Sequence, residues 1–151
     1  MKLEEAIKTN KFLDNKHKAT LNLLYTSYWL KYHFNASLKE MKLTVEQFNV
    51  LRILNGKYPE QMCVKDIATR LIEKSSNVPR IIDRLLIKKL VKRANSKEDK
   101  RETLISITES GLKLLTEANN AMNQLSENII GIDENDAEVL NVLLEKVRKI
   151  D

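Results

Sequence analysis

Hydrophobic residues along this chain recur mostly every three or four positions, the spacing of amphipathic α-helices. This spacing predicts a long helix over residues 11–40, a span that contains no glycine or proline. A second helix is predicted from Thr44, whose hydroxyl and the side chain of Gln47 have the spacing of a capping box. Asn55-Gly56 predicts the end of that helix, because both residue types favour helix C-termini.

Two further helices are separated by a short polar turn. The apolar spacing predicts a third helix over residues 64–73, and a fourth that begins at Ser75 or Ser76 with Pro79 in its first turn. Proline is tolerated there because the first N–H groups of a helix have no partner within it. Two helices joined in this way predict a helix-turn-helix.

After the fourth helix the periodicity changes to that of short β-strands. Residues 90–94 and 103–108 flank the polar segment 95–102, which predicts a β-hairpin with a charged tip. Two last helices are predicted, one from Thr108 to Gly131 and one capped by Asp133. The predicted fold is mainly α with a small β-hairpin wing, in the order α-α-α-α-β-β-α-α, as a single domain over residues 1–151.

Composition narrows the class of protein. The 151 residues include only 3 Gly and 2 Pro, 42% are hydrophobic and 31% are charged, which is typical of a helical globular protein. No apolar run approaches the ~20 residues that span a bilayer, and the first ten residues form no signal segment. The single cysteine, Cys63, cannot form an internal disulfide, so we expect a cytoplasmic protein. No pattern predicts an enzyme or a cofactor, and two histidines without a Cys or acidic cluster predict no metal site.

Positive charge is concentrated in one segment. Residues 65–101 contain 12 Lys and Arg against 5 Asp and Glu, whereas the rest of the chain contains 14 against 16. The net charge of +5 therefore comes from this segment. Such a distribution predicts a surface that binds a polyanion, with a solvated basic surface as the alternative.

Polar side chains opposite the apolar stripe of the fourth helix form a basic face. These side chains belong to Asn77, Arg80, Arg84 and Lys88, whose spacing places them roughly along one side of the helix. In a major groove, arginine can form hydrogen bonds with guanine and asparagine with adenine. Asp83 lies among these residues, so its carboxylate must be paired or turned aside. A solvated amphipathic helix is the alternative. The candidate DNA contacts of this region are Ser75, Ser76, Asn77, Arg80, Arg84 and Lys88.

The hairpin tip supplies a second group of candidates. Lys97, Lys100 and Arg101 follow the helix-turn-helix closely, as expected of a wing that reaches a minor groove or phosphates. Asp99 is close enough in sequence to pair with Arg101 and stabilise the wing. A solvated surface hairpin is the alternative.

Several of these segments resemble one family in the same order. Residues 43–51 (LTVEQFNVL), 75–85 (SSNVPRIIDRL), 90–93 (LVKR), 98–101 (EDKR) and 107–111 (ITESG) are similar to the MarR family of bacterial transcriptional regulators. The resemblance covers roughly residues 12–150. Leu90 stands where the family usually has Gly, and Pro79 stands where Ser or Thr is common.

The resemblance implies an obligate homodimer, a recognition helix in the major groove, a wing in the minor groove, and release from DNA by a ligand or by oxidation. The apolar faces of the terminal helices need a partner, which a second chain would provide. We therefore expect a DNA-binding lobe at about residues 44–108, with dimerisation helices at about 11–40 and 109–150. Two-fold symmetry predicts a pseudo-palindromic DNA site.

Two other features have alternative explanations. Tyr25, Tyr28, Trp29 and Tyr32 either line a pocket for a small aromatic effector, as in relatives of this family, or pack in the dimer core. Cys63 is either a redox sensor or a small buried residue at a helix start.

The sequence thus predicts a transcriptional regulator, and we expect a repressor, that binds double-stranded DNA as a homodimer. The alternative is a winged-helix protein-interaction module without specific DNA binding, which would need neither Arg80 nor Arg101.

Overall fold

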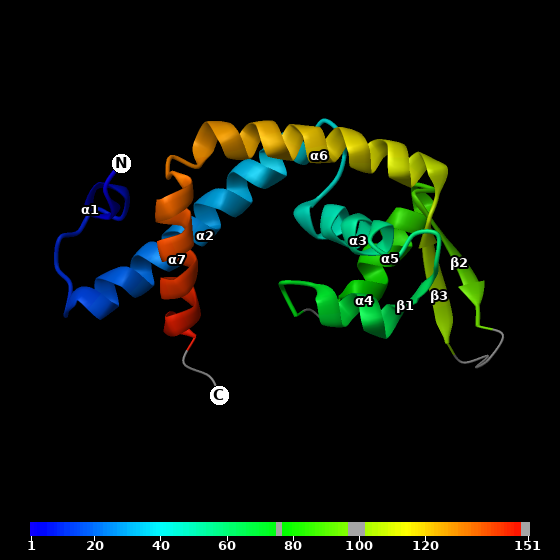
Figure 1. Ribbon diagram of the computed structural model, residues 1–151, viewed down its shortest axis with the longest axis horizontal. Helices are drawn as coiled ribbons and strands as arrows, with labels where there is room; N and C mark the ends of the chain where they lie inside the picture. The colour runs from blue at the N-terminus through cyan, green and yellow to red at the C-terminus, as the bar shows by residue number, and fades with distance from the viewer. Residues whose placement is uncertain (75–76, 97–101, 149–151) are drawn as a thin grey trace.

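The computed structural model describes residues 1–74, 77–96 and 102–148 (Figure 1). The predicted mainly-α architecture with a small β-hairpin is confirmed, with two elements that the sequence did not predict, α1 and β1. The helices and strands are α1 (Leu3–Ala6), α2 (Asn15–Leu38), α3 (Val45–Asn55), β1 (Met62–Cys63), α4 (Val64–Arg70), α5 (Val78–Ile87), β2 (Val91–Asn95), β3 (Thr103–Ile107), α6 (Glu109–Ile129) and α7 (Glu134–Val147).

Side-chain caps explain where several helices begin. The α2 helix begins at Asn15 rather than at residue 11, because the carboxylate of Asp14 accepts the N–H of His17 at 2.7 Å. The predicted capping box of α3 is confirmed, with the N–H of Gln47 donating to Oγ1 of Thr44 at 3.3 Å. The Asp133 cap of α7 is confirmed as well. Each cap satisfies an N–H group that has no partner within the helix.

The turn between α4 and α5 differs from the prediction. The α4 helix ends at Arg70, not at residue 73, because Leu71 takes an extended backbone and stays buried while Ile72 becomes 88% exposed. The N-cap of α5 is Asn77, and Pro79 lies in the first turn as predicted. The predicted caps at positions 75 and 76 lie outside the described residues.

The sheet has three antiparallel strands in the order β1-β3-β2. The predicted hairpin is confirmed, with Val91 opposite Ile107 and Asn95 opposite Thr103. The β1 strand has only two residues, so it carries no periodicity that a sequence could reveal. It is a strand because Met62 pairs with Ile105 of β3.

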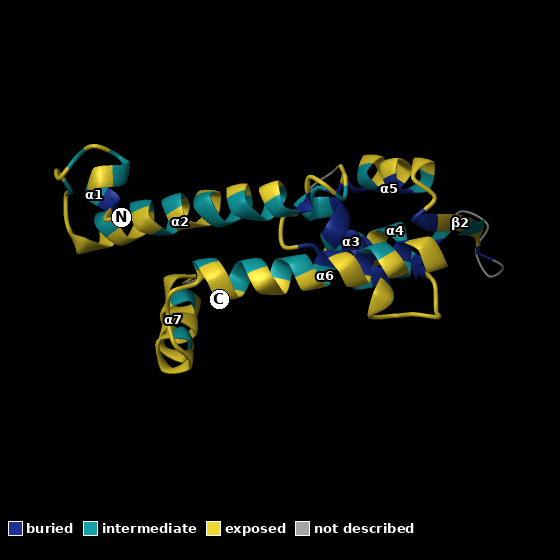
Figure 2. Ribbon diagram, turned by 90° about the horizontal axis from the view of Figure 1, so that it is seen from above, coloured by how far each residue is buried: buried dark blue, intermediate teal, exposed yellow. Residues whose placement is uncertain are grey.

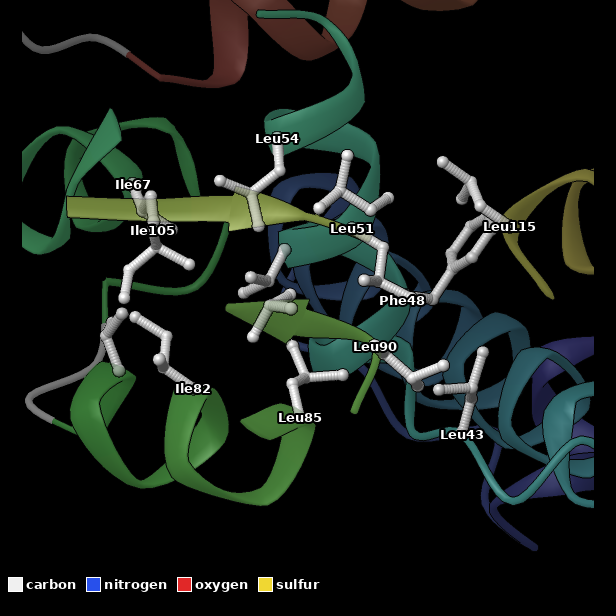
Figure 3. Packing of buried hydrophobic residues seen from close by; sticks show 14 of the residues in the cluster. Leu43, Phe48, Leu51, Leu54, Ile67, Ile82, Leu85, Leu90, Ile105 and Leu115 are labelled. Carbon is white, nitrogen blue, oxygen red and sulfur yellow. The ribbon is translucent and has the colours of Figure 1, made fainter. Parts of the chain in front are cut away.

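One hydrophobic core holds α3, α4, α5 and the sheet together (Figure 3). Leu51 of α3, Ile67 of α4, Ile82 and Leu85 of α5 and Ile105 of β3 are fully buried in it. Removing these side chains from water stabilises the lobe by roughly 1.5–3 kcal/mol each. Because the apolar face of α5 is buried here, its polar face is directed outward.

The α2, α6 and α7 helices extend away from this lobe. Figure 2 shows α2 and α6 side by side, with mostly exposed and intermediate residues along their outer parts. The α7 helix contains no buried residue, although it carries several large apolar side chains. In the single chain the core is therefore confined to the lobe and the helix ends nearest to it.

A close contact joins the start of α6 to the turn that precedes β2. Thr108 donates its N–H to the carbonyl of Leu90 at 3.0 Å, and its hydroxyl donates to the carbonyl of Lys89 at 2.8 Å. Lys89 takes the left-handed conformation of this turn, with φ of 58°, and Leu90 is buried. A Cβ added to Gly111 would lie 2.2 Å from the Leu90 oxygen and 2.7 Å from Cγ1 of Ile107.

We predict that Gly111→Ala lowers the free energy of unfolding by about 1–3 kcal/mol, because α6 must move away from the sheet. Urea unfolding followed by circular dichroism, at one fixed protein concentration, measures this loss. Gly131→Ala is the matched control, since an added Cβ there meets nothing within 4 Å. Equal unfolding free energies for Gly111→Ala and the unsubstituted protein would contradict the prediction.

Candidate nucleic-acid interface

The polar face of α5 carries two exposed arginines. Arg80 and Arg84 lie opposite the buried residues Val78, Ile82 and Leu85 of the same helix. Asn77 is exposed at the N-cap of this helix. All four side chains predicted for this stripe, Asn77, Arg80, Arg84 and Lys88, are exposed. Guanidinium and amide groups at this position match the hydrogen-bonding edges of bases in a major groove.

Lys88, the fourth predicted residue of the stripe, is turned toward α3 instead. Its ammonium group donates to Oε1 of Gln47 at 2.9 Å and to the carbonyl of Lys42. Burial, together with the positive charges of Arg84 and Lys42, lowers the pKa of Lys88 below its ordinary value. Lys88 therefore does not continue the outer stripe of Arg80 and Arg84.

Asp83 is paired within the lobe, as the sequence required. Its Oδ1 accepts a hydrogen bond from the guanidinium of Arg93 on β2 at 2.8 Å. The pair removes a carboxylate from the face that Arg80 and Arg84 share, and it links α5 to the hairpin. Both side chains are about half exposed, so the pair contributes at most about 1 kcal/mol to stability. Its main effect is to orient the hairpin relative to α5.

The remaining predicted DNA contacts fall on segments outside the described residues. They are Ser75 and Ser76 before α5, and Lys97, Lys100 and Arg101 at the hairpin tip, together with the pairing of Asp99 with Arg101. These residues stay predictions. The register of β2 and β3 brings Asn95 opposite Thr103 as the last described pair of the hairpin.

An ion cluster connects α2 to the lobe. Nζ of Lys31 lies 2.6 Å from a carboxylate oxygen of Glu73 and 3.2 Å from one of Glu46. The hydrogen bond to Glu73 is the main reason that the pKa of Lys31 is raised. Burial opposes ionisation of Glu46, but its hydrogen bonds outweigh that effect and its pKa is lowered. Sequence reasoning missed this cluster because Lys31 and Glu73 are 42 positions apart.

A cavity of about 890 Å³ lies beside this cluster. Its walls come from α2, α3, the turn before α5, the polar flank of α5, and α7. Tyr25, Tyr28, Trp29 and Tyr32 do not line this cavity, and their assignment to a ligand pocket or to the dimer core stays a prediction. Tyr28 and Tyr32 are 69% and 62% exposed, and Trp29 packs edge-on against His33 with ring centroids 4.6 Å apart. They lie on another face of α2 from the residues that line the cavity, such as Thr26 and Leu30.

Cys63 serves as the N-cap of α4. Its Sγ accepts the N–H of Asp66 at 3.4 Å, and the residue is half-buried rather than fully buried as expected. In the part of the chain that the structure describes, no three His, Cys, Asp or Glu side chains are grouped so that they could hold a metal ion. Across the same residues, no helix combines the length and apolar character of a membrane span.

A helix-turn-helix with exposed arginines on its second helix, followed by a β-hairpin, defines a winged helix-turn-helix DNA-binding protein. Residues 32–118, more than half of the chain, match the family described as transcriptional regulator SarA/Rot. The chain belongs to this family of winged-helix transcriptional regulators, and the resemblance to MarR regulators is confirmed.

Known proteins agree with this assignment. The HTH-type transcriptional repressor IacR of Pseudomonas putida is 33% identical over 111 residues, which cover 73% of this chain but only 65% of IacR. The crystal structure of a MarR transcription factor from Planctomyces limnophilus is similar, with a TM-score of 0.71, 28% identity, and coverage of 93% of this chain and 100% of that one. The S. aureus MepR–DNA complex shares the fold, with a TM-score of 0.77 at 23% identity over 85% of this chain and 94% of that one.

Proposed function

We propose that this protein is a cytoplasmic repressor that binds a pseudo-palindromic duplex site as a homodimer and acts by binding rather than by catalysis. The observation that carries the proposal is the outward face of α5, where Arg80 and Arg84 are exposed while Asp83 is drawn away by Arg93. Arginine can make two hydrogen bonds to guanine, so this face can discriminate base pairs. The similarity to IacR, whose name is that of a transcriptional repressor, supports repression. The similarity to MepR, whose structure is a complex with DNA, supports DNA as the binding partner.

The exposed apolar face of α7 supports the homodimer. Val139, Val142, Leu143 and Val147 are 47–60% exposed in the single chain. Leu24 and Tyr28 of α2 add apolar surface, with exposed fractions of 65% and 69%. A second copy would cover such surface at about 25 cal/mol per Å² of apolar area buried. We therefore assign dimerisation to residues 11–40 and 109–150, and DNA contact to residues 44–108.

The cavity of about 890 Å³ supports a second role, that of an effector-responsive regulator. It lies between α2 and the polar flank of α5, and Arg80 and Arg84 contribute to its walls. A small molecule bound there would alter the position of α5 relative to α2. Apolar residues such as Leu30 and Phe34 suit an aromatic ring, and Arg80 and Arg84 supply cations for an acidic substituent.

Selection of bound sequences from a random duplex pool, followed by titration, tests the DNA-binding proposal. Arg80→Ala is expected to cost about 1–3 kcal/mol on the selected duplex and to relax base preference at one position. Lys113→Ala is the matched control, an exposed cation that lies on α6 rather than on α5. A protein with equal affinity for every duplex would be the interaction module of the alternative hypothesis.

Sedimentation of the full chain tests the homodimer. Leu143→Glu places a charge on the apolar face of α7, and we expect monomers whose affinity for the selected duplex falls by about 10²-fold or more, because bivalent contact is lost. Tyr58→Glu is the control, since Tyr58 is an equally exposed apolar residue that lies in the loop between α3 and β1. A monomeric unsubstituted protein with full DNA affinity would refute the assignment.

Titration of salicylate and benzoate against the protein–DNA complex tests the effector role. One of these simple aromatic acids is expected to dissociate the complex, and Thr26→Phe, which fills the cavity, is expected to abolish that response. Thr20→Phe, on the same helix but away from the cavity walls, should leave the response intact. Identical behaviour of the two variants would remove the cavity from the proposal.

A further inference from the structure

Four basic side chains converge next to the C-terminal half of α5. Lys39 and Lys42 come from the turn between α2 and α3, and Arg84 and Lys88 come from α5 and its C-cap. Together they line a cavity of about 560 Å³, which we call the cationic turn site. Among the described residues that line it, none is Asp or Glu. Glu40, the acidic residue of the same turn, does not contribute to its walls.

The backbone of the turn explains why these charges gather. Lys42 takes a left-handed conformation with φ of 54°, and its carbonyl accepts the ammonium of Lys88. Gln47, only 3% exposed, accepts from the same ammonium at 2.9 Å. These two contacts join the α2–α3 turn to α5. Both acceptors are neutral dipoles, so they position Lys88 without cancelling its charge.

The described residues that line the site thus carry an excess of positive charge. In the described part of the chain, no carboxylate pairs with Lys39, Lys42 or Arg84. The lowered pKa of Lys88, caused by burial and then by Arg84 and Lys42, is consistent with this excess. Lys31 shows the contrast, because Glu46 and Glu73 neutralise it and its pKa is raised.

The ligand that this chemistry recognises is a phosphate group. Lysine and arginine side chains that line one cavity, with the N-cap of α3 at Thr44 among the same lining residues, favour an anion that has several acceptor oxygens. Arg84 belongs both to this site and to the outward face of α5, so the two surfaces are continuous. A helix that enters a major groove has the phosphates of both strands along its flanks.

We propose that the cationic turn site binds a backbone phosphate of the DNA strand that flanks the groove entered by α5. The inference rests on the proposed DNA-binding function and adds Lys39 and Lys42 to the interface. Both side chains are exposed, so they can reach a phosphate without unfolding any element. Contacts of this kind position the protein on the duplex without reading its bases.

Salt dependence of DNA binding by the full chain tests the proposal. Lys39→Gln combined with Lys42→Gln removes two charges, and the slope of log affinity against log salt concentration should become shallower by about 1–2. Affinity should fall on selected and random duplexes alike, with base preference unchanged. The pair Lys16→Gln and Lys113→Gln, two exposed cations outside the site, is the charge-matched control. Equal slopes for the two double variants would overturn the proposal.

A neutral methylphosphonate, placed in turn at each position flanking one half-site, locates the contact. We expect one position to weaken binding by the unsubstituted protein and to have a much smaller effect on the Lys39→Gln/Lys42→Gln variant. Additive losses at every position would overturn the assignment. Titration with inorganic phosphate, followed through the NMR chemical shifts of Lys42 and Thr44, tests whether the site binds a free phosphate ion instead of a DNA phosphate. Binding of free phosphate with unchanged DNA slopes would assign the site to a small anion instead and would also overturn the proposal.

Failure of this inference and failure of the proposed function give different results. If the unsubstituted protein shows no base preference, the proposed regulator function is refuted. The slopes of log affinity against log salt concentration, measured on a random duplex, still show whether Lys39 and Lys42 contact phosphates. If base preference is present and the slopes of the two double variants agree, only the cationic turn site is refuted.

Discussion

The packing of one face of α5 into the core is the constraint on which the rest of the structure depends. Val78, Ile82 and Leu85 are buried against α3 and the sheet. Since this face is held by the hydrophobic effect, α5 has no freedom to rotate about its axis, and Arg80 and Arg84 must face outward. The polar side chains that we propose to contact DNA are thus oriented by the apolar side chains on the opposite face of the same helix.

Charge in the lobe is arranged by pairing. Asp83 is satisfied by Arg93, and Lys31 is satisfied by Glu46 and Glu73, so these groups hold elements together. Arg80 and Arg84 stay on the surface of α5, and the cationic turn site extends that surface toward α2. A net charge of +5 would explain affinity for polyanions in general. Because Asp83 and Lys31 are paired while Arg80 and Arg84 stay exposed, the positive charge is concentrated on the surface of α5 and of the adjacent cationic turn site.

The extended helices differ from the lobe in how much of their apolar surface is buried within the single chain. The lobe buries its own core, whereas α7 buries nothing and exposes a row of valines and leucines. This division is the one expected if a second copy of the chain covers the apolar face of α7, as we propose. The Lys31 cluster and the adjacent cavity lie where these two parts meet, which is where a change in spacing would arise.

The sequence by itself determined the features that depend on neighbouring residues. The caps at Thr44 and Asp133, the position of Pro79, the hairpin, and the opposition of Arg80 and Arg84 to an apolar stripe all follow from periodicity and local hydrogen bonding. Only the tertiary structure decided the features that join distant positions. The β1 strand exists because Met62 meets Ile105. The ammonium of Lys88 is directed toward α3 because Gln47, 41 positions away in sequence, lies within hydrogen-bonding distance of it. Helical spacing likewise tells which residues of α2 share a face, but only the tertiary structure shows which face borders the cavity.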